Sequence, residues 1–262
     1  MPRANPKTLI VIPARIGSTR LPEKMLLNKT GKPLICHTYE RALSAKADKV
    51  IVATDEPRIV AAINNFGGIA QLTKSTHQSG TDRVAEIASS NPEFDIIINV
   101  QGDEPEVDPE AINKLIELQK EHAPFIGTMC CPFSSSTNPV DSPQNPACVK
   151  VALGKAANEN SSARFALYFS RSLIPYPQAT KGTVTNPQNY YRHLGIYAFS
   201  KESLKKFTAL PNSFLATTES LEQLRALENG HQILVGEVAK AFSGIDTIED
   251  YEQFVKRQNH AN

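Results

Sequence analysis

The chain has 262 residues, of which 28 are Lys or Arg and 27 are Asp or Glu, so its formal net charge at pH 7 is +1. This near balance excludes a global basic surface for nucleic acid or an anionic membrane, so any anion site has to be a local cluster. The four cysteines lack CxxC spacing, and no apolar run reaches the roughly 18 residues of a membrane span. We therefore expect a cytoplasmic protein with free thiols, no membrane insertion and no nucleic-acid partner.

Short apolar runs alternate with segments of helical period through the first half of the chain. This alternation predicts the α/β class, with a mostly parallel sheet flanked by helices. Leu34, Thr38 and Ala42 recur four residues apart and predict a helix between the first two strands. The predicted strands of this half are residues 9–12, 50–54, 69–72 and 96–100.

Aspartate followed closely by proline marks two further helix starts. Asp55 is the predicted N-cap of a helix that ends at Gly67-Gly68. Asp108 stands directly before a proline and predicts a helix that runs to about His122. The first half therefore reads as strands and helices in strict alternation.

The middle third is rich in Ser, Asn, Asp and Pro and has no clear apolar period. We interpret it as strands joined by long loops, a strand-and-loop subdomain for dimerisation or for a lid. The predicted loops are 132–146, 158–162 and 176–189. The predicted strands are 126–131, 149–153, 191–199 and 233–238, and the predicted helices are 201–209, 218–229 and a last one after residue 246.

The segment after the first strand, residues 13–24, concentrates positive charge in an otherwise balanced chain. It contains Arg15, Arg20 and Lys24 together with Gly17 and Ser18. Ligands of open parallel sheets bind beyond the carboxyl ends of strands, where backbone NH groups and basic side chains suit a triphosphate. A solvated surface loop is the alternative, but the position after a strand favours the triphosphate site. No GxxxxGK[ST] string occurs and no GxGxxG follows a strand, so P-loop and dinucleotide sites lose their usual support.

Two aspartates are candidate ligands for a divalent cation. Asp103 follows the fourth strand in NVQGDEP, and Asp246 lies near the C-terminus in GIDTIED. Magnesium takes one or two carboxylates together with substrate phosphates. Asp103 is equally a turn former and Asp246 equally the N-cap of the last helix. The residues alone do not bring the two carboxylates together.

Residues 77–83, HQSGTDR, lie between the third strand and the next helix and carry hydrogen-bonding side chains beside a glycine. Such a segment suits the edge of a nucleotide base. The alternative is a helix start capped by Ser79 or Thr81, and both interpretations can hold together.

The later segments carry candidates for binding an acidic sugar. Arg171, Arg192 and His193 suit a carboxylate, whereas Glu222 and Gln223, expected on a helix, suit sugar hydroxyls. Alternatively, His193 makes only a structural hydrogen bond, and Glu222 and Gln223 lie on a solvent-exposed helix face.

The chain closely resembles the 3-deoxy-manno-octulosonate cytidylyltransferases, or CMP-Kdo synthetases, over about residues 9–254. The matching strings are, in order, PARIGSTRLPEK, GKPLICHTYERA, VATDE, HQSGTDRVAE, NVQGDEP, ALYFSRSLIP, RHLGIYAF, LEQLRALENG and GIDTIEDYE. The resemblance implies a single domain over 1–262 of the nucleotide-diphospho-sugar transferase type, with a nucleotide-binding half at about 8–125 and a sugar-binding and dimerisation half at 126–262. It also implies a homodimer that transfers CMP from CTP to Kdo with Mg²⁺, giving CMP-Kdo and pyrophosphate for lipopolysaccharide biosynthesis.

The resemblance further implies the roles of individual residues. Arg15, Lys24 and Asp103 would be catalytic, and Asp103 and Asp246 would bind magnesium. The implied nucleotide-binding residues are Pro13, Ala14, Arg15, Ser18, Arg20, Lys24, His77, Ser79, Gly80, Arg83 and Gln101. The implied sugar-binding residues are Gln101, Arg171, His193, Tyr197, Glu222 and Gln223.

Several positions depart from the family pattern, and two other functions compete with it. Ile16 replaces a common aromatic residue, Glu23 a usual glycine, Met25 a usual proline and Ala216 a frequent glutamate, and the segment 154–163 is longer than usual. One rival is a cytidylyltransferase for another acidic sugar, such as 8-amino-Kdo or a sialic acid relative. The other is a non-catalytic nucleotide-binding protein of the same fold, which retention of the cationic and acidic site residues disfavours.

Overall fold

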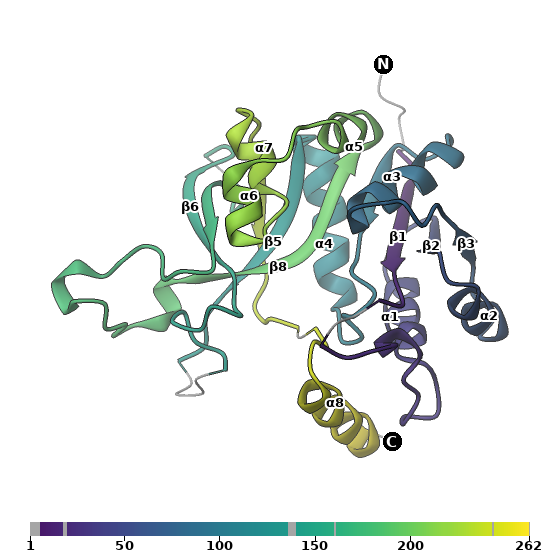
Figure 1. Cartoon of the computed structure of the whole chain (residues 1–262). Coiled ribbons are helices and arrows are strands. Elements are labelled where there is room, and N and C mark those ends of the chain that lie inside the picture. The colour runs from purple at the N-terminus through teal and green to yellow at the C-terminus, as the bar shows by residue number, and fades with distance from the viewer. Residues whose placement is uncertain (1–5, 18–19, 136–139, 160, 243, 262) are drawn as a thin grey trace. The chain divides into compact units, whose positions relative to one another are not determined.

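The computed structural model describes residues 6–17, 20–135, 140–159, 161–242 and 244–261 (Figure 1). The chain packs as two compact units, one made of residues Met1–Ile116 and Phe242–Asn262, the other of Glu117–Ala241. The C-terminal segment thus belongs to the N-terminal unit, although the expected functional halves are divided near residue 125. The functional assignment of those halves stays a prediction.

A parallel sheet with strand order β3-β2-β1-β4 forms the centre of the first unit. Every residue of β1 is buried, because its apolar run faces helices on both sides of the sheet. The strands are β1 (Thr8–Ala14), β2 (Lys49–Thr54), β3 (Ala70–Leu72) and β4 (Ile96–Asn99). The helices of this unit are η1 (Lys24–Leu26), α1 (Leu34–Leu43), α2 (Pro57–Asn65), α3 (Gly80–Ser90) and α8 (Ile248–Ala261). The four predicted strands and their parallel arrangement are confirmed.

Helix α1 begins after Pro33 without a side-chain cap, whereas α2 begins after a capping carboxylate. The stripe of Leu34, Thr38 and Ala42 in α1 is fully buried, as its spacing predicts. The N-cap of α2 is Glu56, whose carboxylate accepts a hydrogen bond from the backbone of Arg58, so the prediction of Asp55 as that cap is wrong. Asp55 instead forms an ion pair with Arg83. The Asp55 carboxylate therefore pairs with a side chain distant in the sequence and does not bond to the start of α2.

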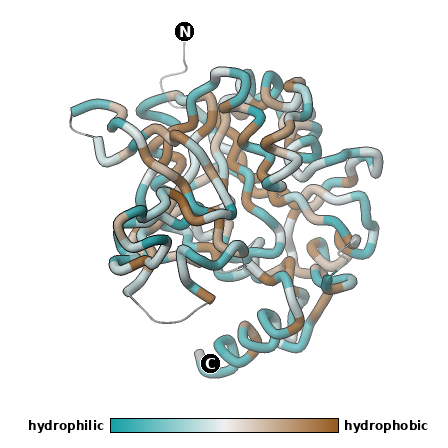
Figure 2. The backbone as a smooth tube through the Cα atoms, turned by 60° about the vertical axis from the view of Figure 1, so that its left-hand side comes forward, coloured by the Kyte–Doolittle hydropathy of each residue, from teal (hydrophilic) through white to brown (hydrophobic). Residues whose placement is uncertain are grey.

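Helix α8 is amphipathic, and Figure 2 shows brown residues spaced along an otherwise teal helix. Its Tyr251 and Phe254 pack with Leu21, Leu34 and Ile245 into one apolar cluster of the first unit. The Tyr251 hydroxyl also accepts a 2.7 Å hydrogen bond from the backbone NH of Lys29. These contacts attach the C-terminal helix to the segment that follows the basic loop.

The second unit contains a mixed sheet of order β8-β5-β9-β7-β6, which closes on itself because β6 also pairs with β8. Strands β5 and β9 are parallel, and the other pairs are antiparallel. The strands are β5 (Ile126–Pro132), β6 (Lys150–Ala156), β7 (Arg164–Ser170), β8 (Tyr191–Ser200) and β9 (Ile233–Glu237). The strand-rich architecture expected of this part is confirmed.

Helices of the second unit differ from the prediction at one place. The single helix expected over 218–229 is wrong, because Ser220 adopts a left-handed backbone with φ 52° and ends the first helix. Glu222 and Gln223 therefore lie in the turn between two helices. The helices are α5 (Lys201–Thr208), α6 (Phe214–Glu219), α7 (Leu224–Glu228), η2 (Gln178–Thr180) and η3 (Pro187–Asn189), and α4 (Pro109–His122) contains the boundary between the units. Within the described ranges, no helix is long and apolar enough to cross a membrane.

Candidate active site

A cavity of about 440 Å³ opens in the first unit where β1 and β4 end. All expected nucleotide-site residues line it apart from Ser18, which lies outside the described residues. The lining residues are Pro13, Ala14, Arg15, Gly17, Arg20, Lys24, Met25, His77, Gln78, Ser79, Gly80, Arg83, Gln101, Gly102, Asp103 and Asp246. Loops after parallel strands converge at one edge of a sheet, and this convergence assembles the cavity.

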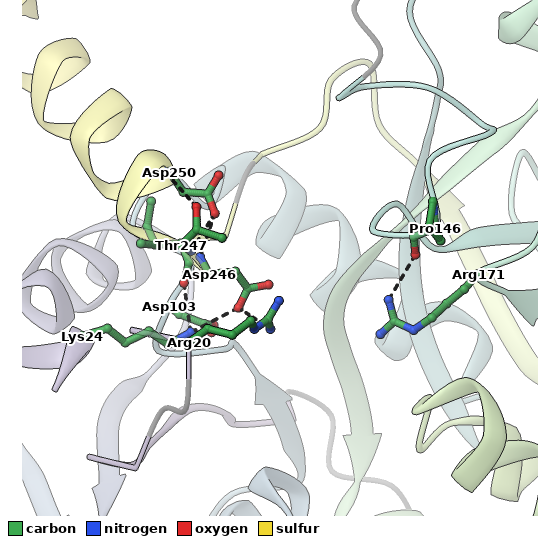
Figure 3. Close-up of polar contacts among 9 residues, drawn as sticks. Arg20, Lys24, Asp103, Pro146, Arg171, Asp246, Thr247 and Asp250 are labelled. Carbon is green, nitrogen blue, oxygen red and sulfur yellow. Dashed lines mark hydrogen bonds and ion pairs between the residues drawn. The ribbon is translucent and has the colours of Figure 1, made fainter. Parts of the chain in front are cut away.

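A buried lysine joins the two aspartates at the floor of this cavity. Lys24 is 7% exposed, and its Nζ lies 2.5 Å from Asp103 Oδ2 and 3.4 Å from Asp246 Oδ1 (Figure 3). The same ammonium donates a 2.9 Å hydrogen bond to the carbonyl of Ile245. Arg20 adds a second cation, with Nη2 2.9 Å from Asp246 Oδ1. The structure thus brings together carboxylates that lie far apart in the sequence.

Local capping explains why the Asp246 side chain faces the cavity. Thr247 precedes α8, and its hydroxyl accepts a 3.2 Å hydrogen bond from the backbone NH of Asp250. The Asp250 carboxylate accepts in return from the backbone NH groups of Thr247 and Asp246, at 2.9 and 3.1 Å. This reciprocal pair is a capping box. The alternative of Asp246 as the cap is therefore wrong, and its carboxylate is available to Lys24 and Arg20.

The chemistry of Asp103 and Asp246 suits a hard divalent cation. Both are oxygen donors, and the Lys24 ammonium between them shows that the pair attracts positive charge. The described residues contain no group of three or more His, Cys, Asp or Glu side chains that could hold a metal alone. A magnesium ion at this pair would complete its coordination with phosphate oxygens and water, which is its usual preference.

The N-terminus of α3 forms another wall of the cavity. Ser79 caps the helix through a capping box with Asp82, which confirms one of the two predicted caps. A Cβ on Gly80 would come within 3.4 Å of Pro13 and 3.7 Å of the Gln101 side chain. These are ordinary van der Waals distances, so the helix start lies beside the end of β1 and a small side chain would also fit there. Unpaired NH groups at such a helix end favour anions and polar edges.

Two of the expected nucleotide contacts are already held by protein groups. Arg83 is 5% exposed, donates a hydrogen bond to Thr73 and lies 3.3 Å from the Asp55 carboxylate. His77 Nε2 contacts the Glu86 carboxylate, and this bond lowers the pKa of Glu86. Both side chains therefore stabilise the cavity wall, and neither adds an unbalanced positive charge.

Four lining residues were not predicted individually as nucleotide contacts: Gly17, Met25, Gln78 and Gly102, although Gly17 and Gln78 lie in the segments predicted for the triphosphate and the base. Each is adjacent in the sequence to a predicted residue or lies within a matching string, which is the signal that would have identified it. Gly102 has a clear physical reason, since an added Cβ would lie 3.0 Å from the carbonyl oxygen of Pro13 and 3.1 Å from Ile35. Close backbone approach thus requires glycine between Gln101 and Asp103.

Arg171 follows β7 in the second unit and is held by a frame of backbone and carboxylate groups. Its Nε donates to the carbonyl of Glu219 at 2.7 Å, and its Nη1 donates to the carbonyl of Pro146 at 3.2 Å (Figure 3). The Glu219 carboxylate accepts from the Arg171 backbone NH at 2.9 Å and from the Ser170 hydroxyl at 2.6 Å. Glu219 therefore organises Arg171, a role that was not predicted from the sequence.

His193, Tyr197 and Gln223 form a second polar group in this unit. His193 Nε2 lies 2.9 Å from the Thr128 hydroxyl, and burial lowers the pKa of this histidine to about 3. Tyr197 donates a 3.1 Å hydrogen bond to Gln223 Oε1. Gln223 is 1% exposed, and within the described part of the chain its Nε2 has no hydrogen-bond partner. A buried unpaired amide is costly unless a ligand satisfies it.

Burial holds the pKa of His193 well below its usual range, so the imidazole would meet a sugar carboxylate through a hydrogen bond, and its sugar-binding role stays a prediction. Arg192 is also occupied, since its Nη1 lies 3.3 Å from the Asp141 carboxylate. Arg171 is consequently the better candidate for a carboxylate in the second unit.

Comparisons with known proteins agree on one group. The family model described as Cytidylyltransferase matches residues 9–233. The chain is 43% identical over 256 residues to 3-deoxy-manno-octulosonate cytidylyltransferase of Rhodopirellula baltica, covering 96% of this chain and 98% of that one. It is 45% identical over 254 residues to the enzyme of the same name from Thermodesulfovibrio yellowstonii, covering 94% and 95%. The solved structure of CMP:2-keto-3-deoxy-manno-octonic acid synthetase complexed with CTP is similar with a TM-score of 0.85 and 40% identity, over 98% of this chain and 100% of that chain.

Proposed function

The chain belongs to the 3-deoxy-manno-octulosonate cytidylyltransferase family, and we propose that it transfers CMP from CTP to the anomeric hydroxyl of Kdo. The products are CMP-Kdo and pyrophosphate. The observation that carries the proposal is the cluster of Lys24, Asp103 and Asp246 at the floor of the strand-end cavity. A nucleotidyl transfer needs positive charge for the leaving pyrophosphate and oxygen ligands for a cation, and this cluster contains both.

The cavity suits CTP because its walls have distinct chemistry. Arg15, Arg20 and Lys24 line the side that would receive the triphosphate. The start of α3, with Ser79 and Gly80, brings backbone NH groups to the same cavity and suits polar groups of the nucleotide. The cytidine is accordingly assigned to the segment around residues 77–83 and Gln101.

Asp103 and Asp246 would hold Mg²⁺, and Lys24 would then be free to contact phosphate. When bound, the ion would supply positive charge against the triphosphate oxygens. Asp103 is oriented by a backbone link, since the NH of Ile245 donates a 2.8 Å hydrogen bond to its carbonyl. That link also keeps the segment containing Asp246 beside Asp103, and a cation bound between the two carboxylates would displace the Lys24 ammonium.

Kdo is assigned to the second unit through Arg171, His193, Tyr197, Glu222 and Gln223. The Arg171 guanidinium is the group for the sugar carboxylate, because its partners leave donors available. The unpaired Gln223 amide suits a sugar hydroxyl. Neutral His193 would donate or accept a hydrogen bond rather than provide charge.

In the proposed reaction the anomeric oxygen of Kdo attacks the α-phosphorus of CTP in line. The oxygen–phosphorus bond forms as the bond to the bridging oxygen of pyrophosphate breaks, and the hydroxyl proton is released. Lys24 and Arg20 balance the negative charge that moves onto pyrophosphate. No covalent intermediate with the protein is required.

We extend the proposal to a cytoplasmic homodimer that serves lipopolysaccharide assembly, as the family resemblance implies. Sedimentation equilibrium of the purified protein measures the first point. A mass of one chain at micromolar concentration would remove the dimer from the proposal and leave the reaction unaffected.

The reaction is tested by pyrophosphate release from CTP with magnesium and, in turn, Kdo, 8-amino-Kdo and a sialic acid. Each mixture is repeated with EDTA. We expect release with Kdo that EDTA abolishes. Release only with another sugar would retain the mechanism and change the substrate, and no release with any of the three would favour a nucleotide-binding protein without turnover.

A further inference from the structure

A lysine buried in the second unit holds three backbone carbonyls. Lys150 opens β6 and is 0% exposed. Its Nζ donates to the carbonyls of Cys148 at 2.7 Å, Asn145 at 3.0 Å and Arg171 at 2.5 Å. An ammonium has three N–H donors, so this side chain is saturated by neutral acceptors.

Such an arrangement is expensive for a structural role alone. Among the described residues no carboxylate forms an ion pair with Lys150, and burial lowers the pKa of its ammonium to about 8. The charged and titratable groups that face it are the Cys148 thiol, the Glu219 carboxylate and the Arg171 guanidinium. An apolar side chain would avoid this desolvation cost but would leave the three carbonyls without a donor, so the ammonium fixes the positions of the segments that carry them.

The three carbonyls belong to the segments that fix Arg171. One is the carbonyl of Arg171 itself. The other two belong to Asn145 and Cys148, which lie on either side of Pro146 in the loop before β6. Pro146 in turn accepts a hydrogen bond from Arg171 Nη1 (Figure 3). Lys150 therefore controls both the backbone that carries the guanidinium and the loop that receives it.

The contacts of Arg171 leave a defined set of donors. Arginine has five N–H donors in a planar fork. Within the described chain, Nε is bonded to the Glu219 carbonyl and one Nη1 hydrogen to Pro146, so three N–H bonds are available at the outer end of the fork. Their direction depends on the loop position that Lys150 sets.

We propose that Lys150 is a positioning residue for the sugar carboxylate, acting by holding Arg171 and the 145–148 loop in the orientation that presents the outer edge of the guanidinium. The inference rests on the proposed function, in which Arg171 binds that carboxylate. Lys150 itself does not contact substrate. If Lys150 were purely structural, its replacement would lower stability and change KM for CTP and for Kdo alike. If it is a positioning residue, its replacement changes KM for Kdo alone.

The first test compares Lys150→Met with Lys155→Met, a change of an exposed lysine on the same strand. Initial rates of pyrophosphate release give KM for Kdo and for CTP separately. We expect Lys150→Met to raise KM for Kdo about tenfold, because small misplacements of binding groups have effects of this size, and to leave KM for CTP within about twofold of wild type. Lys155→Met should match wild type.

A double-mutant cycle with Arg171→Ala separates positioning from general damage. If Lys150 acts through Arg171, adding Lys150→Met to Arg171→Ala should raise KM for Kdo no further. Full additivity, or an equal loss for CTP and Kdo, overturns the inference. A wild-type enzyme that is inactive with Kdo overturns the proposed function instead, before any variant is compared.

The pH dependence of the unmodified enzyme keeps the inference testable even if Lys150→Met does not fold. Above about pH 8 the neutral amine retains two N–H donors for three carbonyls, so KM for Kdo should rise while KM for CTP stays level. The same rise in Cys148→Ala excludes titration of the neighbouring thiol. A flat KM for Kdo from about one pH unit below that pKa to about one unit above it contradicts the positioning role.

Discussion

Replacement of Lys24 by methionine tests the site most directly. The change removes an ammonium 2.5 Å from Asp103 and 3.4 Å from Asp246 while retaining the length of the side chain. Loss of one preorganised charge at a developing anion lowers kcat by about 10²–10³-fold. We expect a decrease of this size for pyrophosphate release.

The stability cost of Lys24→Met should be smaller than the kinetic effect. A charge-assisted hydrogen bond contributes roughly 1.5–3 kcal/mol, and the partly exposed Asp103 carboxylate regains water when its partner is lost. We therefore expect the free energy of unfolding in urea to fall by about 1–2 kcal/mol. Arg20 continues to balance Asp246.

Lys29→Met is the matched control, because Lys29 is exposed and lies 3.8 Å from Glu252. Its kcat and unfolding free energy should stay close to wild type. If Lys24→Met retained kcat within about twofold of wild type, the buried ammonium would be a structural ion pair and the transfer mechanism would lose its leaving-group cation.

Three further outcomes follow from the same contacts. Asp246→Asn should lower kcat sharply with little change in thermal unfolding, because Thr247 and not Asp246 caps α8; a large loss of stability in calorimetry would contradict this separation. Gly102→Ala should reduce the unfolding free energy by about 1–3 kcal/mol, since the new methyl group would lie 3.0 Å from a Pro13 carbonyl oxygen; urea titration measures it, and an unchanged midpoint would refute the close approach. Burial lowers the pKa of His193 to about 3 from 6.5, so the unfolded chain binds the proton more readily and the stability from neutral His193 is lost as pH falls from 6.5 towards 3. His193→Gln should make the decline in unfolding free energy over this range shallower, by up to about 1.4 kcal/mol per pH unit, and an identical slope in both proteins would show that the histidine is accessible to protons.

The Glu23 departure from the family pattern has a structural explanation. Its backbone has φ 54°, a left-handed conformation that glycine adopts with the least strain. The Glu23 carboxylate lies 2.8 Å from Arg58 Nη1, so a neighbouring cation balances its charge. The acid next to Lys24 in the sequence therefore pairs with α2 rather than with the phosphate-binding side of the loop. Nothing in the structure explains Ala216.

Much of the fold and of the nucleotide site follows from local patterns in the chain. Apolar runs and helical periods predicted the four parallel strands of the first unit, because burial on both faces leaves a continuous hydrophobic signal. The loops after those strands were predicted to carry the site, because parallel strands end at one edge. Residues that follow β1, β3 and β4 line one cavity.

Other features depend on contacts between distant segments and have no local signature. The pairing of Lys24 with Asp103 and Asp246 joins residues 79 and 222 positions apart. Asp55 forms an ion pair with Arg83 and does not cap α2 as predicted. The left-handed backbone of Ser220 ends a helix that was predicted to continue. The spacing of apolar residues indicates which faces of a helix or strand are buried. The partner of a charged side chain depends instead on which distant segments pack within a few ångströms of it. The residue types of this site were therefore readable from the sequence, and the tertiary structure alone decided which of them meet.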